Sequence, residues 1–246
     1  MPPARTLSML LLAALLAFLL TGPVPGQPTE TSPSVQVRVQ RALGLLAAGR
    51  SDEAEAIFEE VVAEDPSHGT ARLQLGRLAL ERGELDPARR HLEIAVDSDP
   101  QRLYLARFLL GRVALAEGDA AAALEAFAGA LDSAPGFGPA RLGLAEASLL
   151  AGRDEAAVDA AMEASRAEVT HRAATLLGGE LLAYLGRDEE ARALLEPLAA
   201  EAEEVGAEGV AARAYLYALD GSAEARRDLR VLLGRNLSRA AIYRAF

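Results

Sequence analysis

One segment of the chain contains a complete helix–turn–helix pattern. Leu75–Pro100 reads LGRLALERGELDPARRHLEIAVDSDP. Small or apolar residues occur three or four positions apart on both sides of Gly83, which is the spacing of one face of an α-helix. Glycine just past a helix end adopts the left-handed conformation without a Cβ clash. Asp86 followed by Pro87 predicts the start of a second helix, with Asp86 as its cap and Pro87 at the first helical position.

The same corner recurs along the chain at a nearly constant interval. The six glycines that mark it are separated by 34 or 35 residues; they are Gly49, Gly83, Gly118, Gly152, Gly186 and Gly221. A fixed period of this length indicates a repeat array, in which each repeat buries its apolar face against its neighbours. Small residues such as Gly76 and Gly111 let two helices approach closely, and the larger Leu92 and Phe127 are expected to fill the space between repeats.

Three prolines complete the pattern, since Pro66, Pro100 and Pro135 end the second helix of their repeats. With these glycines, small and large residues and prolines, the chain resembles the tetratricopeptide repeat proteins. The resemblance implies an all-α, right-handed α-solenoid of five to six helix–turn–helix repeats over 35–235, followed by a C-terminal capping helix over 236–246. The expected repeats are 35–68, 69–102, 104–137, 138–171, 172–205 and 207–235.

The N-terminal residues have the three-part layout of a secretory signal peptide. Arg5 gives a positive start, Leu7–Leu20 form an apolar run, and small residues precede a cleavage point after Gly26. The sequence thus predicts a signal peptide over 1–26, a disordered lead-in over 27–34, and a periplasmic or secreted protein. The alternative is an N-terminally membrane-anchored protein whose signal segment is not cleaved.

Composition argues against most kinds of chemistry. The 246 residues contain no cysteine and no lysine, and the formal net charge is −11. An acidic chain repels nucleic acid, and without cysteine there are no thiolate zinc ligands or cysteine nucleophiles. The three histidines, His68, His91 and His171, show no metal-binding spacing. We therefore expect a non-catalytic protein with no cofactor and no metal.

The first helices of such arrays line the concave face, which makes that face the expected binding groove. The candidate contacts there are Leu73, Arg77, Leu80, Phe108, Arg112, Leu115, Leu142 and Glu146. Two apolar rows flank a polar row whose charge changes from positive to negative along the array. This pattern favours a scaffold that binds a protein or peptide segment. Two alternatives remain open: the groove carries a lipid or an apolar small molecule, or tight curvature already buries the leucines.

A row of arginines occupies one position in four consecutive repeats; its members are Arg38, Arg72, Arg107 and Arg141. One hypothesis is that these arginines bind a carboxylate-rich or phosphorylated partner. The other is that each arginine stem packs between helices while its head meets a nearby carboxylate. The sequence does not decide between the two.

Overall fold

The computed structural model describes residues 34–167, 170–200, 207–221, 223 and 227. Residues 1–37 and 38–246 form separate compact units, and of the first unit only residues 34–37 are described. The predicted signal peptide, the lead-in as far as residue 33, and the predicted capping helix over 236–246 lie outside the described residues.

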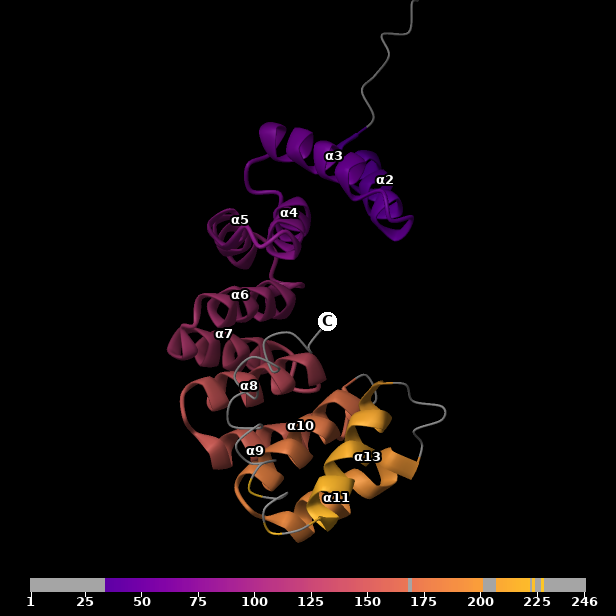
Figure 1. Cartoon of the computed structure of the whole chain (residues 1–246). Helices are drawn as coiled ribbons and strands as arrows, with labels where there is room; N and C mark the ends of the chain where they lie inside the picture. The colour runs from indigo at the N-terminus through magenta and orange to yellow at the C-terminus, as the bar shows by residue number, and fades with distance from the viewer. Residues whose placement is uncertain (1–33, 168–169, 201–206, 222, 224–226, 228–246) are drawn as a thin grey trace, which may run out of the picture. The chain divides into compact units, whose positions relative to one another are not determined.

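All the secondary structure in the described residues is helical, as Figure 1 shows. The helices are α2 (Val35–Ala47), α3 (Ser51–Glu64), α4 (Gly69–Glu81), α5 (Leu85–Ser98), α6 (Leu103–Glu117), α7 (Ala120–Ser133), α8 (Gly138–Leu150), α9 (Asp154–Ala164), α10 (His171–Tyr184), α11 (Asp188–Ala200) and α13 (Ala207–Asp220). The predicted all-α array of helix–turn–helix repeats is therefore confirmed. None of these helices is long and apolar enough to cross a membrane.

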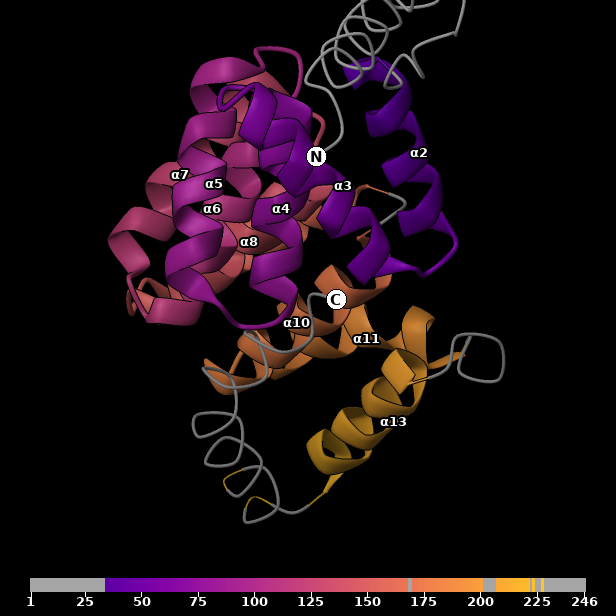
Figure 2. The same cartoon turned by 90° about the horizontal axis from the view of Figure 1, so that it is seen from above.

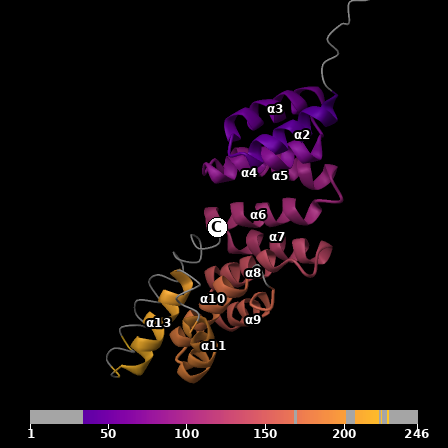
Figure 3. The ribbon, with the colours of Figure 1, turned by 90° about the vertical axis from the view of Figure 1, so that its right-hand side faces the viewer.

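Within residues 38–246 the helices pack in chain order. From α3 to α11 each helix contacts the one that follows it, and α13 contacts both α10 and α11. Figure 3 shows this succession from the side, and Figure 2 shows the paired helices α4 and α5 from above. The even-numbered helices are the first helices of the repeats, and α6 also contacts the first helices α4 and α8. Cohesion is therefore local, as expected for a repeat array.

The corners predicted at five of the six glycines are present, with one correction to the capping, and Gly221 is not among the described glycines with a positive φ. Gly49, Gly83, Gly118, Gly152 and Gly186 all have φ between 68° and 78°. After Gly118 the side chain of Asp119 caps α7 by accepting a hydrogen bond from the Ala122 amide at 2.9 Å.

The cap predicted at Asp86 is wrong, because α5 begins at Leu85 with Glu84 in the cap position. One residue after the glycine is enough to start the helix, just as at Gly118 and Asp119. Pro87 is consequently the third helical residue. Its position is still tolerated, because the first turn of a helix has no internal acceptor for its N–H groups.

The large side chains of the second helices fill hollows left by glycines of the first helices. Phe127 on α7 is fully buried. A Cβ added to Gly111 on α6 would lie 2.6 Å from the Phe127 ring, and one added to Gly143 on α8 would lie 2.5 Å from it. Gly76 and Leu92 have the same relation between α4 and α5, at 2.6 Å. Each large residue thus fits a space that only glycine leaves open.

The buried residues gather mainly in two clusters that meet at α8. The first extends from α4 to α8 and includes Phe127 together with Ala140 and Ala147 of α8. The second extends from α8 to α13 and includes Leu142 of α8 and Leu219 of α13. Helix α8 therefore contributes to the interior on both sides.

Replacing Gly111 or Gly143 by alanine is expected to destabilise the array by about 1–3 kcal/mol, because the new methyl group overlaps the rigid Phe127 ring. The matched control is Gly44→Ala in α2, where no atom lies within 4 Å of the added Cβ. Alanine should there gain roughly 1 kcal/mol of helix propensity. Chemical denaturation followed by circular dichroism measures the three variants. Wild-type stability in Gly111→Ala would contradict the packing described above.

Candidate functional site

The structure places most of the predicted groove contacts in the interior. Leu73, Phe108, Leu115, Leu142 and Glu146 are buried, whereas Arg77, Leu80 and Arg112 are partly exposed. The structure thus agrees with the alternative in which the apolar side chains are already covered. Whether a partner contacts these positions stays a prediction, but the accessible part of the set is now limited to three residues.

Phe108 shows why these apolar residues belong to the interior. Its ring lies 5.9 Å from that of Phe127 and 5.3 Å from that of Phe137, measured between ring centroids. The contact with Phe137 is edge to face, a favourable arrangement for aromatic pairs. Phe108 is therefore a packing residue that joins α6 to α7 and to the turn before α8.

A row of charged residues occupies one position on four first helices. This first-helix row consists of Arg77 on α4, Arg112 on α6, Glu146 on α8 and Glu180 on α10. Arg77 is held on its own helix, donating to Glu81 at 2.6 Å and to Gln74 at 3.1 Å. The acidic members are much less accessible, since Glu146 is 6% exposed and Glu180 is 1% exposed. Along the array the row therefore changes from arginine to glutamate, and the glutamate side chains are less exposed than that of Arg77.

Burial dominates the electrostatics at the middle of the first-helix row. It raises the pKa of Glu146 to about 8, and the nearby positive charge of Arg112 opposes this rise. Burial also lowers the pKa of Arg112, against the attraction of Glu146 and Glu81. At neutral pH most Glu146 carboxyls therefore carry a proton.

The raised pKa of Glu146 predicts a pH-dependent stability. Between about pH 4.5 and pH 8 the unfolded chain has lost this proton while the folded protein keeps it, so stability falls as pH rises through that window. Glu146→Gln removes this term. At pH 8.5 the variant should be more stable than the wild type by an amount of the order of 5 kcal/mol, with little difference at pH 4.5.

Denaturation curves across pH 4.5–8.5 test this expectation. Glu125→Gln changes an exposed carboxylate on α7 and is the matched control, whose stability should run parallel to that of the wild type. A Glu146→Gln curve that also runs parallel to the wild-type curve would contradict the raised pKa.

The arginine row is used to join the helices of a repeat. Arg38 on α2 pairs with Glu64 on α3, and the Nε of Arg141 on α8 lies 3.3 Å from Glu163 on α9. Arg107 on α6 donates to the backbone carbonyl of Gly129 on α7 at 2.9 Å.

The remaining arginine of the row, Arg72, follows the same rule. Its Nε donates to the carbonyl of Pro66 at 2.8 Å, and its Nη1 lies 3.1 Å from Nδ1 of His91 on α5. All four arginines therefore reach the second helix of their own repeat, which supports the packing interpretation. On α10 the same position is Thr175, whose buried hydroxyl has no hydrogen-bond partner among the described residues.

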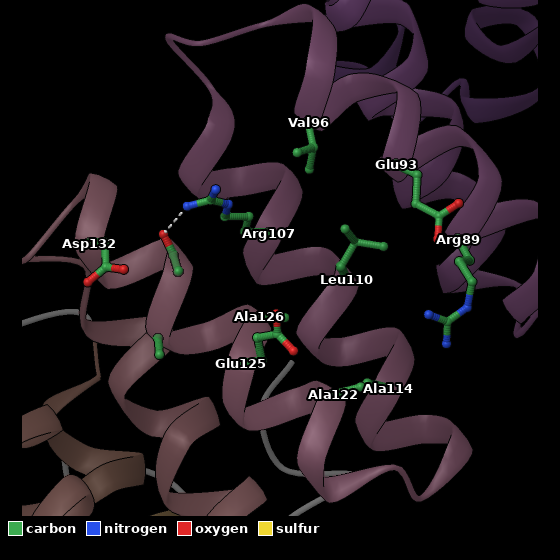
Figure 4. Close-up of a pocket in the computed structure, with 12 residues that line it drawn as sticks. Arg89, Glu93, Val96, Arg107, Leu110, Ala114, Ala122, Glu125, Ala126 and Asp132 are labelled. Carbon is green, nitrogen blue, oxygen red and sulfur yellow. Dashed lines mark hydrogen bonds between the residues drawn. The ribbon is translucent and has the colours of Figure 1, made fainter.

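The structure also contains a groove that the sequence did not reveal. Figure 4 shows this α5–α7 groove, which has a volume of about 690 Å³ and is lined by residues of α5, α6 and α7. Val96, Leu110 and Ala114 form apolar parts of the wall, and its charged residues are Arg89, Glu93, Arg107, Glu125 and Asp132. The sequence feature from which this groove could have been predicted is the run of alanines at the start of α7, because short side chains leave space beside a helix.

The histidines have separate structural positions. His68 caps α4 by accepting a hydrogen bond from the Ala71 amide at 3.2 Å. His91 is half-buried beside Arg72, and burial together with the nearby positive charges lowers its pKa. His171 begins α10. Within the part of the chain that the structure describes, no group of three or more histidine and acidic residues is arranged to hold a metal.

Comparison with known families identifies the class of protein. The tetratricopeptide repeat profile matches residues 45–109 and 114–179, which together make up just over half of the chain. The chain therefore belongs to the tetratricopeptide repeat family. Proteins of this family are generally non-catalytic scaffolds that bind protein or peptide partners.

Solved structures share the fold at low sequence identity. The thermophilic tetratricopeptide repeat protein TTC0263 of Thermus thermophilus is 24% identical with a TM-score of 0.56, covering 76% of this chain and 98% of its own. YrrB, a repeat protein with an unusual peptide-binding site, is 18% identical with a TM-score of 0.57, covering 72% and 89%. PilF of Pseudomonas aeruginosa is 18% identical with a TM-score of 0.62, covering 84% and 91%. No curated protein matches the sequence.

Proposed function

We propose that this protein is a non-catalytic scaffold that binds a segment of a partner polypeptide along its first helices. The observation that carries the proposal is the first-helix row, in which two arginines are followed by two glutamates on successive helices of an established interaction fold. A row that changes from arginine to buried carboxyl groups favours one direction of a bound segment, since the reversed segment would bring its basic residues against the arginines.

The accessible part of this surface lies on α4. The Arg77 side chain is 36% exposed, Leu80 is partly exposed, and Glu81 follows on the same helix. Because the Arg77 guanidinium is the outermost positive charge of the row, an acidic residue of the partner would be placed there. Arg112 lies deeper and contributes through its charge, and the buried Glu146 contributes through the shape of the surface.

The alternative of a lipid carrier loses the observation on which it was based. It required the leucines of the first helices to line an open apolar groove. Leu73, Leu115 and Leu142 instead belong to the buried interior. The candidate contacts that are still partly exposed are Arg77, Leu80 and Arg112, and two charged residues of three suit a peptide better than an acyl chain.

Double substitution at α4 tests the proposed binding surface. Arg77→Glu/Leu80→Ala should lose a partner that the wild type captures from an envelope extract, because it reverses the outer charge and removes apolar contact. The control is Arg90→Glu/Leu131→Ala, which makes the same two kinds of change on the second helices α5 and α7. Circular dichroism melting of all three proteins must first show that they fold alike.

Equal capture by the two variants would place the binding surface elsewhere. Phe108→Ala is unsuitable for this test, because loss of its packing against Phe127 and Phe137 would affect stability as well as binding.

We further propose that the protein is exported to the periplasm or secreted. The support is the charged start, the apolar run Leu7–Leu20 and the small residues before Gln27. Such a location suits a chain without cysteine, because its stability does not depend on the redox state of the compartment.

Expression in a Gram-negative host with subcellular fractionation tests export. The expected product is periplasmic and has the mass of a chain that begins at Gln27. Leu12→Arg/Leu16→Arg interrupts the apolar run and should keep the protein in the cytoplasm. A full-length product in the membrane fraction would indicate the anchored alternative, and a cytoplasmic wild-type protein would contradict export altogether.

A further inference from the structure

The two kinds of helix in the repeats carry opposite charge. The first helices α2, α4, α6, α8 and α10 contain eight arginines and four acidic residues. The second helices α3, α5, α7, α9 and α11 contain three arginines and 19 acidic residues. The first helices therefore have a formal positive charge and the second helices a strongly negative one. A surface formed by second helices consequently attracts basic partners and repels acidic ones.

The arginines of the first helices neutralise part of this acidic surface, but they do not reach the carboxylates of α7. In the repeat formed by α8 and α9, Arg141 pairs with Glu163 at 3.3 Å. In the repeat formed by α6 and α7, the equivalent Arg107 donates instead to the backbone carbonyl of Gly129 at 2.9 Å. Arg107 lines the α5–α7 groove, but its hydrogen bond leaves the acidic side chains of α7 without that arginine.

The α5–α7 groove lies on this acidic side of the repeats and has an apolar floor. Leu110 on α6 and Val96 on α5 are partly exposed there. Ala122 and Ala126 lie four residues apart on α7, so they share one face of that helix, and both line the groove. The volume of about 690 Å³ is within the range of roughly 300–1,000 Å³ that is usual for binding sites.

Three exposed carboxylates surround this floor. They are Glu93 on α5 and Glu125 and Asp132 on α7. Among the described residues none of the three forms an ion pair or a side-chain hydrogen bond. Arg89, which also lines the groove, pairs with Glu117 on α6. The three carboxylates are therefore available to cations from outside the groove, and the view in Figure 4 shows the apolar floor between those of α5 and α7.

We propose that the α5–α7 groove binds a basic segment of a partner polypeptide. An apolar side chain of the segment contacts Leu110, and its lysine or arginine side chains contact Glu93, Glu125 and Asp132. The last two lie seven residues apart on α7, which separates the bound cations by roughly 10 Å along the helix. A polypeptide is the expected occupant because the tetratricopeptide repeat family binds protein or peptide partners.

This inference goes beyond the proposed function, which assigns a partner to the first-helix row. The α5–α7 groove uses second helices and attracts the opposite charge. The two surfaces can therefore bind two segments, and either proposal can fail without the other.

Fluorescent peptides test the groove in the full chain. The main probe is a helical peptide with lysine on both sides of a leucine. One comparison peptide has glutamate in place of each lysine, and the other has serine in place of the leucine. Fluorescence anisotropy should give the main probe a Kd about tenfold below those of the other two, because it alone matches both the carboxylates and the apolar floor.

Substitution of the carboxylates tests their role. Glu125→Gln/Asp132→Asn should raise the Kd of the main probe by about fivefold, because two ion pairs are lost. The control Glu59→Gln/Asp159→Asn makes the same change in net charge at exposed positions of α3 and α9 and should leave the Kd unchanged. Circular dichroism melting first shows that the variants fold alike.

Methyl NMR locates the bound probe. The signals of Leu110 and Val96 should shift when the main probe is added, whereas that of Leu80 on α4 should not. Arg77→Glu/Leu80→Ala, which tests the proposed function, should leave the Kd of this probe unchanged. The outcomes of the two proposals are thereby distinguished.

Four results would overturn the proposal. Equal Kd values for the two basic peptides would mean that the apolar floor has no role. An unchanged Kd in Glu125→Gln/Asp132→Asn would exclude the carboxylates. A shift of Leu80 without a shift of Leu110 would place the probe on the first helices. Binding that occurs only after Arg235→Glu/Arg239→Glu would make arginines of the chain itself the occupant.

Discussion

The fit of a large side chain into a hollow between glycines is the constraint on which the array depends. Phe127 lies against Gly111 of its own repeat and Gly143 of the next. Hydrophobic burial alone would bring the helices together without fixing their separation, because it has no preferred direction. A rigid ring between two backbones does fix it. The same relation between Gly76 and Leu92 shows that the constraint is repeated along the chain.

Surface charges connect successive repeats in a different way. Arg82 holds Glu55 of the preceding repeat through two hydrogen bonds of 2.5 and 2.6 Å, which lowers the pKa of that carboxyl. Arg187 reaches Glu155 of the preceding repeat at 2.8 Å. Exposed pairs of this kind contribute little stability, typically about 0–1 kcal/mol. These pairs recur beside the glycine corners, and we therefore infer that they align neighbouring repeats and add little to the free energy of unfolding.

The sequence was sufficient to predict the fold, because the rules involved are local. For the candidate site it predicted which residues occupy equivalent positions in successive repeats, but not how deeply each one is buried. A glycine past a helix end and a proline beyond the next helix act through neighbouring residues, and the period then places every repeat. The start of α5 was wrongly predicted at Asp86, because the preference of aspartate for the cap position does not fix the number of residues between the glycine and the next helix. The same period placed Arg77 and Glu146 in one row. The burial of Glu146 and Phe108 was not decidable from the sequence, since it depends on neighbouring helices that no single repeat contains.

The two buried clusters that share α8 divide the array into two parts. Ala140 and Ala147 join α8 to the helices before it, and Leu142 joins it to those after it. Helices α9, α10, α11 and α13 can consequently separate from α8 without disturbing the contacts among α4–α7. The division of the buried residues at α8 therefore allows unfolding in two stages, with α8 as the element common to both parts.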